Sequence, residues 1–200
     1  MKLDQLAHAV GCTGILPDME ITGLCTDSRR AKAGDLFFCY RGQKFDSHSC
    51  VAQLKEAGVA ALVCERKLDC DLPQIVVADG RAAVAKAARI FYGEADRVLK
   101  LVAVTGTNGK TTTTYMLDSI FRAAGKKCGI IGTLGITYGG RFIAPELTTP
   151  DPVYLHSVLR DMADCGVEYV VMEVSAHALD FAYVPGLRFC VGIFPHSRPR

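Results

Sequence analysis

The segment Thr105–Thr112 combines residue types that bind phosphate groups. It reads Thr-Gly-Thr-Asn-Gly-Lys-Thr-Thr and follows the apolar run Leu101–Val104. Glycines let a backbone curl so that successive N–H groups point at phosphate oxygens, and a following helix N-terminus adds a favourable dipole. Lys110 is placed to reach terminal phosphates, and the Thr111 hydroxyl suits a magnesium ion. The spacing is Gly-x-x-Gly-Lys-Thr, shorter than the common phosphate loop, and it predicts a nucleotide-phosphate site.

A carboxylate ends a second apolar run. Tyr169–Met172 is followed directly by Glu173. Parallel strands bring residues at their carboxyl ends to one edge of a sheet, where a phosphate loop also lies. An acidic side chain there can hold magnesium directly or through water and balance the phosphate charge. We therefore predict Thr111 and Glu173 as the metal-binding pair, with a solvated strand-end glutamate as the alternative.

Strands and helices alternate around these residues. The second half predicts strands at 101–104, 128–131, 168–174 and 188–194, a hairpin at 134–144, and helices at 110–124 and 152–165. The first half predicts strands at 20–25, 35–40, 59–64 and 74–78, and helices at 3–10, 49–57 and 81–92. Alternation of this kind implies right-handed βαβ units and an α/β fold with a doubly wound, mostly parallel sheet. The polar segment Gly93–Arg97 predicts a boundary, which gives domains at 1–95 and 98–194.

The composition is that of an ordinary globular protein. Half of the 200 residues are hydrophobic, 22% are charged, and the net charge is +2. This balance argues against a generic nucleic-acid-binding protein, and no apolar run approaches the length of a membrane span. The nine cysteines contain no CxxC pair and fit reduced thiols. We expect a cytoplasmic protein with no nucleic-acid or membrane partner, and its oligomeric state is not readable from the sequence.

Further motifs occur in order along the chain. They are Thr26–Arg29, Asp35–Phe38, Gly42, Asp46–His48, Thr105–Thr112, Thr148–Pro150 and Met172–Leu179. Together they resemble the motif series of the Mur ligase family, and within it the MurE type. The resemblance extends over nearly the whole chain, and it implies a small UDP-sugar-binding domain followed by the first part of an ATP-binding domain.

The resemblance implies an ATP-dependent amide ligase of peptidoglycan precursor synthesis. In such an enzyme ATP, with Mg²⁺, phosphorylates the D-Glu carboxylate of UDP-N-acetylmuramoyl-L-Ala-D-Glu, and the amine of a diamino acid, lysine or diaminopimelate, attacks the acyl phosphate. The implied catalytic residues are Lys110, Glu173 and His177. The implied ATP-binding residues are Gly106, Thr107, Asn108, Gly109, Lys110, Thr111 and Thr112. The implied substrate-binding residues are Ser28, Gln43, Lys44, Phe45, Thr148, Thr149, Ser175 and Tyr183.

The chain departs from the family pattern in a few places. Tyr183 stands where the family usually has a basic residue, and a phenol cannot replace a cation that pairs with a carboxylate or phosphate. After Phe194 the family continues with a metal-binding Asp-His-Leu-Asp segment, whereas this chain reads Pro195–Arg200. We interpret 195–200 as an aberrant tail of an incomplete sheet. The third, amino-acid-binding domain is missing on this interpretation, so we expect this fragment to be inactive as a ligase.

Other functions stay open from the sequence. A related Mur ligase or a folylpolyglutamate-type ligase would share the phosphate loop, although Asp27–Arg29 and Gly34–Phe38 favour the muramoyl substrate. A non-catalytic module that binds a UDP-sugar or a nucleotide is the alternative from another class. A phosphate-loop kinase or GTPase would need an acceptor site or a switch region that we do not find in the sequence.

Overall fold

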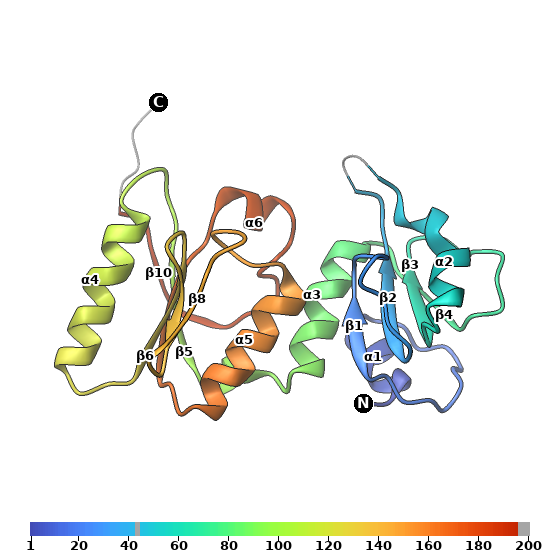
Figure 1. Ribbon diagram of the computed structural model, residues 1–200, viewed down its shortest axis with the longest axis horizontal. Helices are drawn as coiled ribbons and strands as arrows, with labels where there is room; N and C mark the ends of the chain where they lie inside the picture. The colour runs from blue at the N-terminus through green and yellow to red at the C-terminus, as the bar shows by residue number, and fades with distance from the viewer. Residues whose placement is uncertain (43–44, 196–200) are drawn as a thin grey trace. The chain divides into compact units, whose positions relative to one another are not determined.

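The structure is a computed structural model that describes residues 1–42 and 45–195. Its contacts divide the chain into two units, Met1–Phe91 and Tyr92–Arg200. The division falls shortly before the polar segment Gly93–Arg97. Each unit contains one β-sheet with helices against it (Figure 1).

A four-stranded sheet organises the first unit. Its strands are β1 (Gly23–Cys25), β2 (Asp35–Cys39), β3 (Ala61–Cys64) and β4 (Gln74–Val76). They lie in the order β1-β2-β3-β4, and every neighbouring pair is parallel. β2 and β3 are buried along their whole length, as expected for parallel strands that are covered on both faces.

Helices lie on both sides of this sheet. On one side α2 (Val51–Glu56), preceded by the 3₁₀ helix η1 (Ser47–Cys50), contributes Leu54 to a cluster with Phe37 and Leu62. On the other side, as Figure 1 shows, α3 (Gly80–Phe91) lies against β2 and β3, and α1 (Leu3–Ala9) contacts α3. The apolar side chains of the first unit are therefore divided between two layers.

Several elements of the first unit begin or end at other residues than predicted; β3 begins at Ala61 and not at 59, and β4 ends at Val76 and not at 78. The predicted helix at 49–57 begins earlier, as η1, because the Asp46 side chain accepts the N–H of His48 and starts a tight turn there. The predicted strand at 20–25 is shorter, since only Gly23–Cys25 pairs with β2. Glu20 instead forms an isolated antiparallel bridge with Lys2.

A six-stranded sheet organises the second unit. The strands are β5 (Lys100–Val104), β6 (Cys128–Gly132), β7 (Gly135–Tyr138), β8 (Arg141–Ile143), β9 (Tyr169–Glu173) and β10 (Phe189–Ile193). Their order is β10-β5-β9-β6-β7-β8. β10, β5, β9 and β6 are parallel, and the predicted hairpin adds β7 and β8 as an antiparallel edge.

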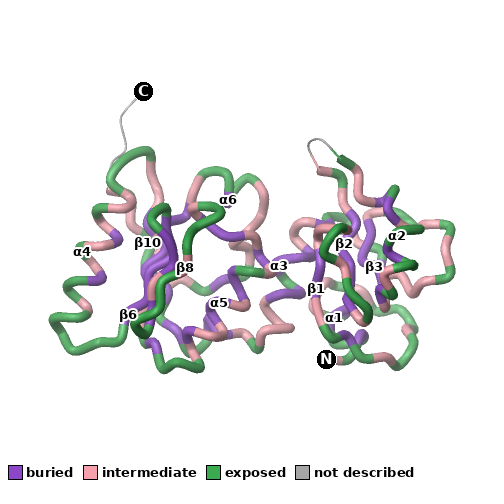
Figure 2. Tube along the Cα trace, viewed as in Figure 1, coloured by how far each residue is buried: buried purple, intermediate pink, exposed green. Residues whose placement is uncertain are grey.

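Long helices cover opposite faces of this sheet. α4 (Lys110–Ala123) places Leu117 and Phe121 against a buried cluster of β5, β6 and β9 side chains. α5 (Pro152–Asp164), whose first turn is capped by the Asp151 carboxylate, packs on the opposite face with Leu155 and Met162. Figure 2 shows the central strands buried and the β8 edge exposed. The predicted α/β class with a doubly wound, mostly parallel sheet is confirmed.

Two short helices of the second unit were not predicted. They are η2 (Ala95–Arg97) and α6 (Ala176–Asp180), and each is too short to show a helical period in the sequence. In the part of the chain that the structure describes, no helix has the length and apolar character needed to cross a membrane.

Candidate functional site

The Thr105–Thr112 segment connects the carboxyl end of β5 to the first turn of α4. Gly106 and Gly109 have φ values of 138° and 79°, a region that favours glycine, and Gly109 immediately precedes the helix. Thr107, Asn108 and Gly109 are exposed, so the loop is open to solvent. Such a loop at a helix N-terminus offers its backbone N–H groups and the helix dipole to an anion.

Lys110 turns its side chain back over this loop. Its Nζ donates a hydrogen bond of 2.7 Å to the Gly106 carbonyl oxygen, and the residue is half-buried. The ammonium group is thereby held above the turn in which the glycines lie. Thr111 is half-buried and Thr112 is exposed one residue further along the helix.

Glu173 ends β9 beside the phosphate loop. The strand register pairs it with Val104, the last residue of β5, while Met172 is paired with Ile131 of β6. The residue is only 1% exposed. Its Oε2 accepts hydrogen bonds from the hydroxyls of Thr111 at 3.1 Å and Thr133 at 3.0 Å. The predicted pair Thr111 and Glu173 is therefore brought into direct contact.

The chemistry of this group fits magnesium. Carboxylate and hydroxyl oxygens are hard donors that Mg²⁺ prefers, and Mg²⁺ usually keeps several waters and takes only one or two protein carboxylates. No Lys or Arg within 1–42 and 45–195 pairs with the buried Glu173 carboxylate. Among those residues, no group of three or more His, Cys, Asp or Glu side chains is placed to hold a metal ion together.

Thr148, Thr149 and Ser175 lie next to Glu173. The buried Thr149 hydroxyl donates to the Glu173 carbonyl oxygen at 2.9 Å and accepts the Ser175 N–H at 3.0 Å. The Ser175 Oγ accepts the N–H of Ala178 and caps α6. Thr149 and Ser175 thus hold the turn after β9, while the hydroxyl of the half-buried Thr148 lies 3.2 Å from that of Thr133.

His177 and Tyr183 form an aromatic group with Phe181. The exposed His177 ring stacks on Phe181 with centroids 4.2 Å apart, and Tyr183 meets the imidazole edge-on at 5.5 Å. The hydrogen bonds of the Glu173 side chain come from Thr111 and Thr133, not from His177. The structure therefore brings His177 together with Tyr183 rather than with the Glu173 carboxylate.

Two predicted substrate residues of the first unit, Ser28 and Phe45, follow the strands β1 and β2 in the sequence. Ser28 is half-buried, and its carbonyl oxygen accepts a hydrogen bond from the Gln53 side chain at 3.2 Å. Phe45 is 60% exposed, and its carbonyl oxygen accepts the N–H of Gly42 at 2.8 Å. The predicted residues Gln43 and Lys44 lie outside the described residues.

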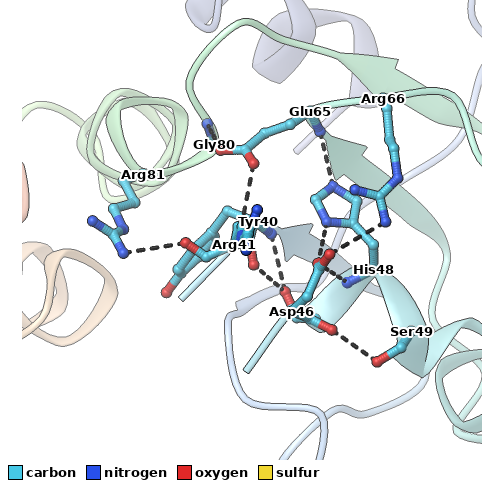
Figure 3. A network of polar contacts seen from close by, with 10 residues as sticks. Tyr40, Arg41, Asp46, His48, Ser49, Glu65, Arg66, Gly80 and Arg81 are labelled. Carbon is cyan, nitrogen blue, oxygen red and sulfur yellow. Dashed lines mark hydrogen bonds and ion pairs between the residues drawn. The ribbon is translucent and has the colours of Figure 1, made fainter. Parts of the chain in front are cut away.

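A polar network links Arg41, Asp46 and Glu65 with their neighbours (Figure 3). His48 is buried, its Nε2 accepts the backbone N–H of Glu65 at 3.1 Å, and its Nδ1 lies 2.5 Å from Asp46 Oδ1. Because Nε2 is an acceptor here, the ring proton is assigned to Nδ1, which donates to Asp46. Arg66 donates to the other Asp46 oxygen at 3.2 Å. The hydrogen bonds from His48 are the main reason why the pKa of Asp46 falls from 3.8 to about 2.

Glu65 belongs to the same network and follows β3 directly. Its Oε1 accepts the N–H of Gly80, the first residue of α3, at 3.1 Å. Its Oε2 accepts the N–H of Arg41 at 3.3 Å, just after β2. One carboxylate therefore joins the start of a helix to the start of the loop, as Figure 3 shows.

The nine cysteines are all free thiols. Those at 25, 39, 50, 64 and 128 are buried, those at 12 and 70 are partly buried, and Cys165 and Cys190 are exposed. Burial raises the pKa of Cys39 to about 12 and that of Cys64 to about 11. The buried thiols of Cys39 and Cys64 thus act as packing groups of the first-unit core.

Sequence reasoning missed Thr133 and Glu65. Thr133 follows the last residue of β6, and Glu65 the last residue of β3, so both stand at the carboxyl edge of a parallel sheet. The rule that found Glu173 would also have selected these positions. Nothing in their local sequence shows which partners they meet, because those partners are 15 to 40 residues away in the chain.

The fold and the loop geometry together define an α/β protein of the phosphate-loop class. Residues 104–197 match the model of the Mur ligase middle domain, and residues 20–111 match that of the Mur ligase family, catalytic domain. The chain belongs to the Mur ligase family.

Curated relatives that match most of this chain share one name. The chain is 45% identical over 175 residues to a UDP-N-acetylmuramoyl-L-alanyl-D-glutamate–2,6-diaminopimelate ligase of Geobacillus thermodenitrificans, a match that covers 88% of this chain and 36% of the relative. It is 39% identical over 198 residues to the ligase of the same name from Geobacter sulfurreducens, covering 97% of this chain and 39% of the relative.

Solved structures agree with this placement. A structure of a ligase of that same name superposes with a TM-score of 0.82 at 25% identity and covers 100% of this chain and 41% of that one. MurF from Acinetobacter baumannii superposes with a TM-score of 0.59 at 31% identity, covering 86% of this chain and 35% of that one. The chain thus spans about two fifths of the length of the relatives it matches.

Proposed function

We propose that this chain represents the UDP-sugar-binding and nucleotide-binding parts of an ATP-dependent ligase of the MurE type. The reaction, proposed for a protein of the relatives' length, joins 2,6-diaminopimelate to UDP-N-acetylmuramoyl-L-alanyl-D-glutamate. The names of the curated relatives support this substrate pair. One structural observation carries the proposal: Lys110, Thr111 and Glu173 meet at one sheet edge, with the two side chains that suit Mg²⁺ in direct hydrogen-bond contact.

ATP with Mg²⁺ supplies the phosphoryl group that activates the D-Glu carboxylate as an acyl phosphate. In this step the residues of the chain bind the nucleotide and orient its phosphates and the cation. The Gly106–Gly109 turn offers N–H groups to phosphate oxygens, and the Lys110 ammonium adds a positive charge above that turn. The Thr111 hydroxyl and the Glu173 carboxylate hold the cation that offsets the phosphate charge. Such a reaction depends on positioning and charge neutralisation more than on covalent chemistry by the protein.

The remaining predicted residues are assigned to the substrate. Thr148, next to the Thr133 hydroxyl, is proposed to meet the sugar-peptide end, while Thr149 and Ser175 shape the turn that carries it. His177 and Tyr183 are proposed to contact the peptide through their aromatic group, in which the His177 ring is exposed. Ser28, with the loop Gly42–Phe45, is proposed to bind the uridine diphosphate end.

Calorimetry with this chain tests the proposal. We expect binding of a non-hydrolysable ATP analogue in the presence of Mg²⁺, and separate binding of UDP-N-acetylmuramoyl-L-alanyl-D-glutamate. Lys110→Ala should weaken analogue binding about 10- to 100-fold, the loss expected for charge-assisted hydrogen bonds. Lys127→Ala, an exposed lysine before β6, is the matched control and should bind as the wild type does.

The outcomes separate the alternatives. Binding of the UDP-sugar dipeptide without any binding of the nucleotide would favour a non-catalytic UDP-sugar module. Nucleotide binding without UDP-sugar binding would favour a general nucleotide-binding protein. Either result would contradict the proposed ligase assignment, and so would an unchanged affinity in Lys110→Ala.

A further inference from the structure

Thr133 holds both oxygens of the Glu173 carboxylate. Its backbone N–H donates to Oε1 at 3.1 Å, and its hydroxyl donates to Oε2 at 3.0 Å. Two donors from one residue fix the plane of the carboxyl group as well as its position. Thr133 itself is exposed and directly follows Gly132, the last residue of β6.

Gly132 makes this placement sterically feasible. A Cβ atom at position 132 would lie 2.4 Å from Glu173 Oε1 and 2.9 Å from its carboxyl carbon. Gly132 lies in an ordinary strand conformation, so an alanine would suit its backbone. The requirement for glycine at this position therefore comes from the carboxylate and not from the main chain.

The direction of each hydrogen bond follows from counting protons. An ionised carboxylate only accepts, and each hydroxyl has a single hydrogen. The Thr133 hydroxyl donates its single hydrogen to Glu173 Oε2. In the 3.2 Å contact between the two threonines, the Thr148 hydroxyl must therefore donate to Thr133 Oγ1. The order is Thr148 to Thr133 to Glu173, and Thr111 donates to the same carboxylate oxygen from the phosphate-loop side.

We propose that Thr133 is a positioning residue that aims the Glu173 carboxylate at the Mg²⁺ ion of the bound nucleotide and connects it to Thr148. The inference rests on the proposed function, since it assumes a magnesium nucleotide at this loop. Residues that orient a metal-binding side chain typically contribute about 10- to 100-fold in metal affinity. Thr133 touches the metal ligand and not the metal, so its loss should appear in the magnesium dependence of binding.

The test compares nucleotide binding by this chain with and without Mg²⁺, using ADP and isothermal calorimetry. Thr133→Val removes the hydroxyl and keeps the backbone N–H, and because the residue is exposed the variant should fold. We expect about a 10-fold or larger loss of apparent Mg²⁺ affinity in Thr133→Val, with unchanged ADP affinity in EDTA. Thr133→Ser should restore the wild-type value. Thr137→Val, on neighbouring β7, is the matched control and should have no effect.

A second variant moves the carboxylate without deleting any donor. Gly132→Ala should reduce Mg²⁺ affinity in the same way, because the added methyl group displaces Glu173 Oε1. Gly192→Ala is its control, since a Cβ at Gly192 in β10 meets no atom within 4 Å. Thermal melts of the apo variants check that each is folded at the temperature of the binding measurements, with some loss of stability expected in Gly132→Ala because a buried carboxylate is displaced.

The results separate two failures. If the wild-type chain shows no magnesium-dependent binding of ADP, the proposed function is wrong and this inference falls with it. If the wild type binds magnesium nucleotide and Thr133→Val and Gly132→Ala bind it equally well, the positioning role alone is wrong.

Discussion

Two glutamates stand at corresponding places in the two units and make different contacts. Glu65 follows the buried strand β3, and Glu173 ends the buried strand β9. Both lie at the carboxyl edge of a parallel sheet. The Glu65 oxygens accept backbone N–H groups from Arg41 and Gly80, whereas Glu173 accepts one backbone N–H and the hydroxyls of Thr111 and Thr133.

The two carboxylates differ in whether their hydrogen-bond donors can also bind a cation. A backbone N–H has no lone pair for a cation, so Glu65 serves to join the first turn of α3 to the loop after β2. A hydroxyl keeps lone pairs on its oxygen while it donates, and the Thr111 oxygen can therefore share a cation with the carboxylate. The sequence pattern is the same in both units, an apolar strand followed by glutamate. In the first unit the carboxylate joins two backbone segments, and in the second it lies beside a hydroxyl with which it can bind a cation.

The largest expected effect follows from neutralising Glu173. Glu173→Gln removes the charge that holds the cation, so magnesium-dependent binding of ADP should fall about 100-fold or more. The fold should tolerate the change, because the Thr111 and Thr133 hydroxyls can turn to accept from the new amide. Calorimetry with and without Mg²⁺ measures the effect. Glu65→Gln is the matched control, and an equal loss in that variant would break the distinction between the two carboxylates.

Replacing Glu65 is expected to change the stability of the first unit and not the binding of magnesium. Glu65→Ala leaves the N–H groups of Gly80 and Arg41 without their acceptor and should lower the free energy of unfolding of the first unit by about 1–3 kcal/mol. Urea denaturation measures the loss, and amide exchange should accelerate at Gly80. Glu56→Ala, an exposed residue of α2, is the control. Faster exchange in the phosphate loop of Glu65→Ala would contradict a role confined to the first unit.

A smaller effect concerns pH and the first unit alone. The folded pKa of Asp46 is lowered from 3.8 to about 2, so its bonds with His48 stabilise the fold above about pH 4. That contribution is lost as the pH falls from about 4 through 2, because the proton then binds the unfolded chain more readily. Thermal melts from pH 6 to pH 2 should therefore show a steeper loss of stability in the wild type than in Asp46→Asn. If the two proteins lose stability in parallel, the Asp46 carboxylate does not contribute to the pH dependence of stability.

The smallest effect is a difference in thiol reactivity between the units. At pH 8 an alkylating reagent should label Cys165 and Cys190 of the second unit quickly, since both are exposed. The buried Cys39 and Cys64 of the first unit should react only after unfolding, because burial keeps them covered and raises their pKa to about 12 and about 11. Peptide mapping by mass spectrometry measures the labelling. Rapid native labelling of Cys39 would show that the first-unit core opens readily.

The sequence by itself determined the fold class and most of the elements. Short apolar runs bounded by glycines are typical of buried parallel strands, so β5, β6 and β9 could be predicted within about two residues. The phosphate loop was equally readable, because its glycines, lysine and threonine are contiguous and their chemistry is local. The motif series also predicted the family to which the chain belongs.

Only the tertiary structure decided which side chains share a site. Thr133 meets Glu173 from 40 residues away, and Glu65 meets Arg41 from 24 residues away, so neither contact leaves a local pattern. His177 is four residues from Glu173 in the sequence, yet its ring packs with Phe181 and Tyr183. The spacing of residues in the sequence determines which side chains one loop or strand places close together. The partners of a carboxylate depend on strand order and register, which the packing of the whole sheet sets.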